Sequence, residues 1–135
     1  ATPAPANAIK VGATGGTNVK LTVNSVKFTV DNGDKKAKEG YTYAIVEATV
    51  ENTGKAAYHS SALVNFAAKS ADGVSYDRAS YTGLKPLDGD IAPGAKLTGE
   101  VAFLVPQTAK GLLVEFAPDL LDTKSYVVVN LGDVK

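Results

Sequence analysis

Hydrophobic and polar residues alternate with a period of two along most of the chain, which predicts β-strands with one buried face. The clearest case is Leu97–Val105, where every second residue is apolar or glycine. The residues from Val19 to Val30 alternate as well, but their phase shifts by one position near Asn24 and Ser25, which predicts a β-bulge there. Further runs of this kind cover residues 43–50, 64–68, 112–116 and 126–131.

Turn residues separate these runs, and no segment keeps a helical period over three turns. Asn52–Gly54 and Pro93–Gly94 are typical turns between strands. We therefore predict an all-β fold, an antiparallel β-sandwich of about seven strands. A chain of 135 residues builds one core, so we expect one domain over residues 17–135, preceded by a flexible lead-in over residues 1–16.

The amino-acid composition argues against several classes of partner and of chemistry. The chain has 14 basic and 14 acidic residues, so it has no net charge and no long-range field that favours nucleic acid or an anionic membrane. Cysteine, methionine and tryptophan are absent, which excludes disulfides, thiol nucleophiles and thiolate or thioether metal ligands within the sequence shown. No apolar run approaches the roughly 20 residues of a membrane-spanning helix. We expect no nucleic-acid partner, no membrane span and a monomer.

The N-terminal stretch suggests a location. The residues ATPAPANA are mostly small and include two prolines, which is typical of the sequence that follows a cleaved signal peptide. We therefore predict a protein that is secreted or lies in the cell envelope. The alternative is a chain trimmed at its N-terminus, which leaves room for an upstream lipid-bearing cysteine and thus for a lipoprotein.

Asp77, Asp88 and Asp90 are the candidate metal ligands. A hard cation such as calcium binds several carboxylate and carbonyl oxygens, and turns supply both. The Asp-Gly-Asp spacing is short and common, so a sandwich corner is the favoured interpretation: Asp88 and Gly89 make one turn and Pro93–Gly94 a second. Calcium or another metal bound by this aspartate-rich loop stays the alternative, and we expect no other cofactor.

The chain offers few catalytic candidates. His59 is the only histidine, and the adjacent Ser60 and Ser61 point to opposite faces of a strand, without a nucleophile elbow. A surface histidine is therefore favoured. Four glutamates that could pair for glycoside hydrolysis lie out of phase with the apolar residues of their strands, which indicates solvent-facing charges. These are Glu47, Glu51, Glu100 and Glu115. We predict that the protein is not an enzyme.

Exposed loops are the favoured contact surfaces. The two longest, Asp31–Gly40 and Tyr81–Ala92, can each reach a partner, and an unpaired edge strand can accept a partner's strand. The six tyrosines could add a recognition surface, although the margins of the core are their favoured place. We therefore predict a non-enzymatic binding module whose ligand is a protein or another component of the cell envelope.

Three stretches carry a family resemblance. They are "ATVENTG" at the end of the strand in Tyr41–Lys55, the "DG…Y" turn in Val64–Asp77, and "I-x-P-G" before "G-x-V-x-F-x-V-P" in Leu87–Pro106. Over residues 18–131 the chain resembles the bacterial domain of unknown function 4352, and it is similar to a mycobacterial secreted immunoprotective antigen. The resemblance implies an immunoglobulin-like sandwich of secreted proteins and lipoproteins, and it supplies no catalytic residues.

Overall fold

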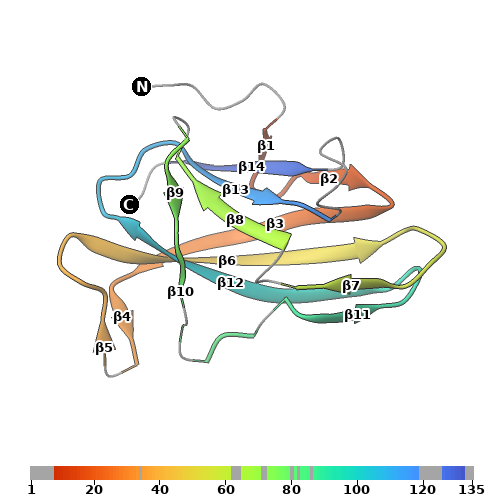
Figure 1. Cartoon of the computed structure of the whole chain (residues 1–135), viewed down its shortest axis with the longest axis horizontal. Helices are drawn as coiled ribbons and strands as arrows, with labels where there is room; N and C mark the ends of the chain where they lie inside the picture. Colours follow the sequence, from red (N-terminus) through yellow and green to blue (C-terminus); the bar gives the residue numbers. More distant parts are fainter. Residues whose placement is uncertain are drawn as a thin grey trace.

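Two five-stranded sheets face each other across a shared core in the computed structural model (Figure 1). The structure describes residues 8–33, 35–61, 65–70, 73–79, 81, 83–85, 87–118 and 126–132. Asp34, Val64, Asp72 and the ends of the chain therefore lie outside the described residues, together with the parts of the predicted strands, turns and loops that they form.

The sheets are called here the β13 sheet and the β6 sheet. In spatial order the β13 sheet contains β1 (Ile9–Lys10), β14 (Val127–Gly132), β13 (Leu112–Phe116), β8 (Phe66–Lys69) and β9 (Ser75–Tyr76). The β6 sheet contains β10 (Arg78–Ala79), β12 (Lys96–Pro106), β6 (Tyr41–Asn52), β3 (Val19–Thr29) and β2 (Thr14–Thr17). The predicted immunoglobulin-like sandwich is confirmed, with short segments added at the sheet edges.

The strands of both sheets pair antiparallel, except that β1 pairs parallel with β14. β1 and most of β2 lie within the predicted lead-in, whose boundary at residue 17 stays a prediction. β2 depends on glycine, because Gly16 has a φ of +108° and a Cβ there would meet the carbonyl oxygen of Val19 at 2.5 Å.

Two short ribbons extend the sandwich. β4 (Asp31–Asn32) pairs with β5 (Lys35–Lys36), and this ribbon projects from one end of the β6 sheet (Figure 1). β7 (Tyr58–Ser60) pairs with β11 (Gly89–Ile91) toward the other end. Both ribbons lie at or inside segments without hydrophobic alternation, because strands of two or three residues are too short to produce it.

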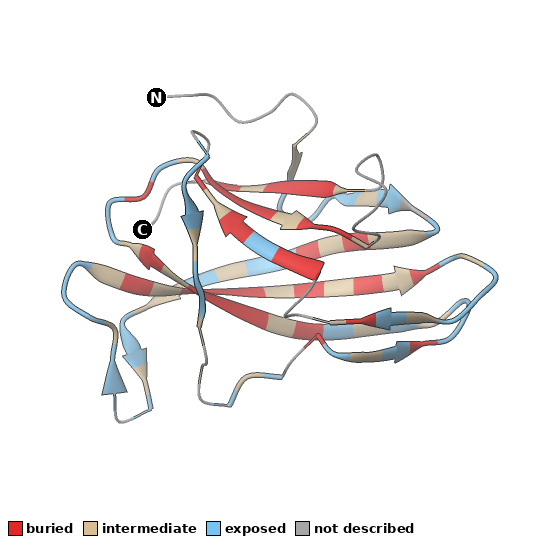
Figure 2. Ribbon diagram, in the orientation of Figure 1, coloured by how far each residue is buried: buried red, intermediate tan, exposed pale blue. Residues whose placement is uncertain are grey.

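Alternate residues of the long strands fill the core between the sheets. Ala44, Val46, Ala48 and Val50 of β6 are each fully buried, and Figure 2 shows the same alternation of buried and less buried residues along β6 and β12. The largest fully buried side chains are Phe103 of β12 and Phe116 of β13, and the ring of Phe116 contacts that of the buried Phe66 at a centroid distance of 4.9 Å. The alternation in the sequence therefore predicts which residues of these strands face the core.

The predicted bulge in β3 is confirmed. The register between β3 and β6 shifts between Val23 and Ser25, so Asn24 has no partner in the ladder. Its side-chain amide donates instead to Oγ1 of Thr49 at 3.1 Å and, at a longer 3.4 Å, to Oε1 of Glu47. The extra residue keeps the apolar positions on both sides of the bulge directed at the core and turns Asn24 outward.

Asn52 joins the turns at one end of the sandwich. Its side-chain amide donates to the carbonyl oxygens of Ala56 at 2.7 Å and of Ile91 at 2.9 Å, and its Oδ1 accepts from the Gly54 amide at 3.0 Å. Its own carbonyl accepts from the Gly94 amide at 2.7 Å. Both predicted turns are present. The Asn52 side chain, in a residue that is 1% exposed, connects the first turn to β11, and the Asn52 backbone carbonyl bonds to the second turn.

Candidate functional site

The three candidate metal ligands lie on two segments. Asp77 follows β9, while Asp88 and Asp90 flank Gly89 at the β11 ribbon, and all three residues are exposed. Asp90 bonds to His59. Within the described ranges, no three or more acidic, histidine or cysteine residues are grouped so that they could hold a metal ion. The aspartate-rich metal site therefore stays a prediction.

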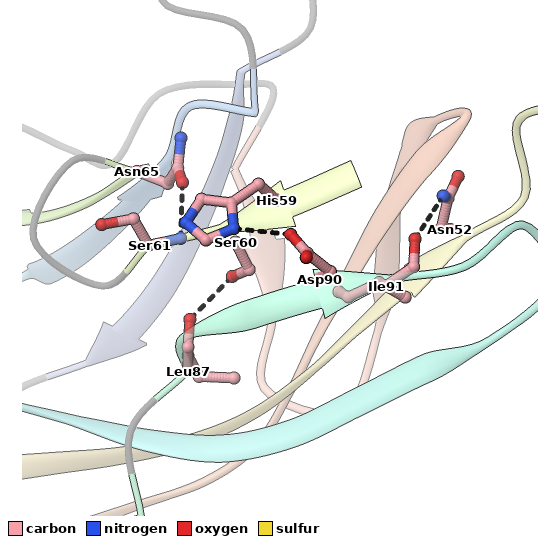
Figure 3. A network of polar contacts seen from close by, with 8 residues as sticks. All are labelled: Asn52, His59, Ser60, Ser61, Asn65, Leu87, Asp90 and Ile91. Atoms are coloured by element: carbon pink, nitrogen blue, oxygen red, sulfur yellow. Dashed lines mark hydrogen bonds and ion pairs between the residues drawn. The ribbon is translucent and has the colours of Figure 1, made fainter. Parts of the chain in front are cut away.

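His59 and Asp90 form a polar pair across the β7–β11 ribbon (Figure 3). Nδ1 of His59 lies 2.8 Å from Oδ1 of Asp90, and the two side chains are 70% and 83% exposed. The Ser60 hydroxyl is directed elsewhere, because it is buried and donates to the carbonyl oxygen of Leu87 at 2.7 Å. Among the described residues, no serine hydroxyl is bonded to the His59–Asp90 pair in the way that a serine–histidine–aspartate triad requires. His59 is the surface histidine that the sequence predicts.

These contacts give a paired prediction. We expect Ser60→Ala to lower the free energy of unfolding by about 1–2 kcal/mol, because the Leu87 carbonyl loses a buried donor. Asp90→Asn should cost less than about 1 kcal/mol, because the pair that it weakens is exposed to solvent. Urea denaturation of both variants measures the difference. A larger loss in Asp90→Asn than in Ser60→Ala would show that the pair has the greater structural role.

The structure separates the four candidate glutamates into two groups. Glu115 is paired with Lys69, whose Nζ lies 3.1 Å from its Oε2, and Glu51 is flanked in register by Lys20 and Lys96. Glu47 and Glu100, by contrast, are direct cross-strand partners on β6 and β12. Among the described residues, neither makes an ion pair within 4 Å. The two half-buried carboxylates therefore share one spot on the outer face of the β6 sheet.

Tyr81 and Lys85, two described residues of the predicted contact loop, contact strands of the β6 sheet. The ring of Tyr81 meets the ring of Tyr43 edge to face at 5.5 Å, and the Glu100 amide donates to the Lys85 carbonyl at 2.6 Å. Ile45 alternates with the core residues Ala44 and Val46 and so faces outward, yet it is only 6% exposed. The outer face is therefore partly covered, although the sequence predicts it to be mostly wet.

This covering leaves a hollow of about 210 Å³ next to the two carboxylates. We call it the outer-face hollow, and it is lined by Ser25, Lys27, Ile45, Glu47, Tyr81, Gly83, Leu84 and Glu100. It combines aliphatic and aromatic walls with three charged side chains. It is smaller and more polar than most small-ligand pockets, which enclose about 300–1,000 Å³, so it has room for one side chain or a small fragment. Its residues come from β3, β6, β12 and the predicted contact loop Tyr81–Ala92.

A second hollow of about 470 Å³ lies at the end of the sandwich near Asn18, Thr53, Lys55 and Tyr58. The fold already uses much of the polar lining there: the Thr53 amide and hydroxyl donate to the Asn18 carbonyl at 2.6 and 3.0 Å. Lys55 is the one charged residue among the described residues that line it. This hollow is larger, but the outer-face hollow offers more groups for recognition.

The other predicted contact loop, Asp31–Gly40, forms the projecting β4–β5 ribbon. Its Lys36 and Asp31 lie 3.9 Å apart with both side chains well exposed. Nζ of Lys38 sits 4.1 Å from the centroid of the Tyr41 ring. The ribbon is thus an exposed, charged surface, and none of its described residues lines either hollow.

The fold and the two-sheet core place the chain among the immunoglobulin-like β-sandwich domains. A family model described as a domain of unknown function, DUF4352, matches residues 10–126. The chain belongs to this family, and the resemblance predicted from the sequence motifs is confirmed.

Solved structures share the fold. The candidate lipoprotein ycdA of Bacillus subtilis is 16% identical with a TM-score of 0.76, over 90% of this chain and 39% of that one. This chain thus spans well under half of that protein. The yjhA protein of B. subtilis is 23% identical with a TM-score of 0.69, over 91% and 98% of the two chains. MPT63, a secreted protein of Mycobacterium tuberculosis, is 16% identical with a TM-score of 0.62, over 93% and 99%.

No curated protein matches the chain. A search of the described residues also finds no helix that is long and apolar enough to cross a membrane. The family match establishes the family of the chain, and the solved structures share its fold.

Proposed function

We propose that this chain is a non-enzymatic binding domain that acts outside the cytoplasm and seats its ligand in the outer-face hollow. The location is supported by the structural neighbours, which include a candidate lipoprotein and a secreted protein. The binding role is supported by the hollow itself, which residues of the Tyr81–Ala92 loop and charged residues of the β6 sheet line together.

One observation carries the proposal. Ile45 faces outward but is only 6% exposed, and it lines one hollow together with Tyr81 and Leu84 of the contact loop and with the carboxylates Glu47 and Glu100. A loop that served as a connection alone would need no such contacts, whereas loops held by a rigid sheet commonly carry binding residues. The proposed site thus lies on one of the two loops that the sequence favours for contact.

A non-catalytic role agrees with the chemistry of the polar groups. No described serine is bonded to the His59–Asp90 pair, and the Ser60 hydroxyl donates to the Leu87 carbonyl. Glu47 and Glu100 lie on one face of a sheet, whereas glycoside hydrolysis needs two carboxyl groups flanking a bound sugar in a cleft. If the protein hydrolysed a 4-nitrophenyl glycoside and Glu100→Gln abolished that turnover, the non-enzymatic assignment would be wrong.

Fragment mapping tests the proposed site. Amide chemical shifts of the labelled protein are recorded with a panel of small cationic, neutral and anionic fragments. We expect the binders to shift amides lining the hollow, such as those of Ile45, Gly83 and Glu100. Ser25→Trp is the matched variant, because Ser25 is an exposed lining residue outside the core, so an indole there fills the hollow. Binders that map elsewhere, or that bind Ser25→Trp equally, would overturn the site.

Calcium or another metal held by Asp77, Asp88 and Asp90 is the alternative function. A ligand at 100 times its dissociation constant adds about 2.7 kcal/mol of stability, which raises the unfolding midpoint of a domain of this size by about 5 °C or more. We expect a change below about 1 °C between EDTA and millimolar calcium. A rise of the larger size that is lost in Asp88→Asn would favour the metal-bound alternative.

A further inference from the structure

We propose that the outer-face hollow accepts one ammonium group on a short aliphatic stem, either a lysine side chain of a partner protein or a small alkylamine. This inference rests on the proposed function and specifies the chemistry of its ligand. It follows from the two carboxylates, from the net charge of the lining and from the apolar walls.

Among the described residues, no cationic side chain lies within 4 Å of either carboxylate of the hollow, although Lys27 lines it. Glu47 and Glu100 face each other directly across β6 and β12, and like charges in that position destabilise a sheet. Within the described structure, their hydrogen-bond donors are neutral and distant: the Asn24 amide lies 3.4 Å from Glu47, and the Lys85 backbone amide lies 3.4 Å from Glu100. A bound cation would remove this repulsion and would form the short charge-assisted bonds that carboxylates favour.

The net charge of the lining indicates the charge of the cation that the hollow can bind. Glu47 and Glu100 contribute two negative charges and Lys27 one positive charge, so the described lining has a net charge of −1. One ammonium neutralises it. Lys27 repels any cation, and a divalent ion about twice as strongly as an ammonium group at the same distance. Calcium also takes six to eight oxygen ligands, whereas this lining supplies two carboxylates. The hollow is therefore suited to a monovalent organic cation.

The walls of the hollow suit an aliphatic stem. Ile45 and Leu84 offer apolar surface, and lysine-like stems pack along such surface while their charged end reaches polar groups. The Tyr81 ring adds a face toward which an ammonium group is attracted. Tyr81 is itself held by its edge-to-face contact with Tyr43, so the ring is in place before the ligand arrives.

Three probes with the same carbon chain test this proposal. Amide chemical shifts are followed during titration with n-butylammonium chloride, 1-butanol and sodium butanoate at one ionic strength. We expect n-butylammonium to shift the amides of Glu47, Gly83 and Glu100, and 1-butanol to bind about tenfold more weakly or worse, because it lacks a charge-assisted bond of about 1.5–3 kcal/mol. Butanoate should leave these amides unchanged.

Matched variants assign the effect to the two carboxylates. Glu47→Gln and Glu100→Gln should each weaken n-butylammonium binding about tenfold, because each removes one charged acceptor. Glu115→Gln is the control, since Glu115 pairs with Lys69 on the other sheet and should leave the affinity unchanged. Unchanged amide shifts away from the substitution show that each variant is folded.

Further comparisons distinguish a lysine side chain from a small amine as the ligand, and separate the ammonium inference from the proposed function. Binding of N-acetyl-lysine methylamide as tight as that of n-butylammonium supports a lysine side chain, and binding of n-butylammonium alone supports a small amine. Three results would show that the ammonium inference is wrong: equally tight binding of 1-butanol in the hollow, full affinity in the glutamine variants, or displacement of n-butylammonium by calcium chloride. Each of them would leave the hollow as a binding site. If no probe of any charge shifts these amides and no fragment of the panel maps there, both proposals fail.

Discussion

Phe116→Ala should lower the free energy of unfolding by about 3–5 kcal/mol, the typical cost of removing a buried aromatic ring. Phe116 is fully buried, lies between Phe66 and Val127 in the β13 sheet and packs its ring against that of Phe66. The alanine would leave a cavity in a core that no disulfide reinforces, since the chain has no cysteine. Urea denaturation with the linear extrapolation measures the change.

Phe116→Leu is the matched control for this variant. It keeps most of the apolar volume, so a loss of no more than about 1.5 kcal/mol is expected. If Phe116→Ala also lowered the free energy of unfolding by less than about 1.5 kcal/mol, the two sheets would not pack tightly around Phe116. This result would contradict the sandwich core described above.

Asn52→Ala is expected to cost about 2–4 kcal/mol, although it removes only a small polar side chain. The Asn52 amide supplies two donors and one acceptor to three backbone groups, including the Ile91 carbonyl across a buried bond. Buried polar groups left without partners cost about 1–3 kcal/mol each. Thermal and urea unfolding of the variant measure the loss.

The control for Asn52 is another asparagine of the same sheet. Asn24→Ala removes an amide that is exposed at the bulge of β3, so water can replace its bonds, and a loss below about 1 kcal/mol is expected. Equal effects of the two substitutions would mean that the turns do not depend on Asn52. Only the larger effect at Asn52 agrees with the role of its side chain as the link between the turn at residues 52–56 and β11.

The sequence predicts those features that depend on neighbours along the chain. The bulge at Asn24 follows from a change of phase within a single strand, and the turns at Asn52–Gly54 and Pro93–Gly94 follow from the residues that make them. The core face of β6 and β12 follows from alternation. Each of these features depends on only a few neighbouring residues, so the local sequence is sufficient to predict it.

The site could not be predicted in the same way, because it depends on register between distant strands. Glu47 and Glu100 each appear solvent-facing in their own strands, and only the pairing of β6 with β12 places them side by side. The Asn52 bond to Ile91 spans 39 residues, and the His59 bond to Asp90 spans 31. Alternation predicts which face a residue occupies, and it does not predict which residue stands beside it.

A crystal structure of the protein soaked with the tightest-binding fragment of the panel tests the central claim most directly, namely that the outer-face hollow is the ligand site. We predict density for the fragment beside the Tyr81 ring and within hydrogen-bond distance of Glu47 or Glu100. Density confined to the hollow near Lys55, or to the ribbon that carries Asp88 and Asp90, would contradict the claim.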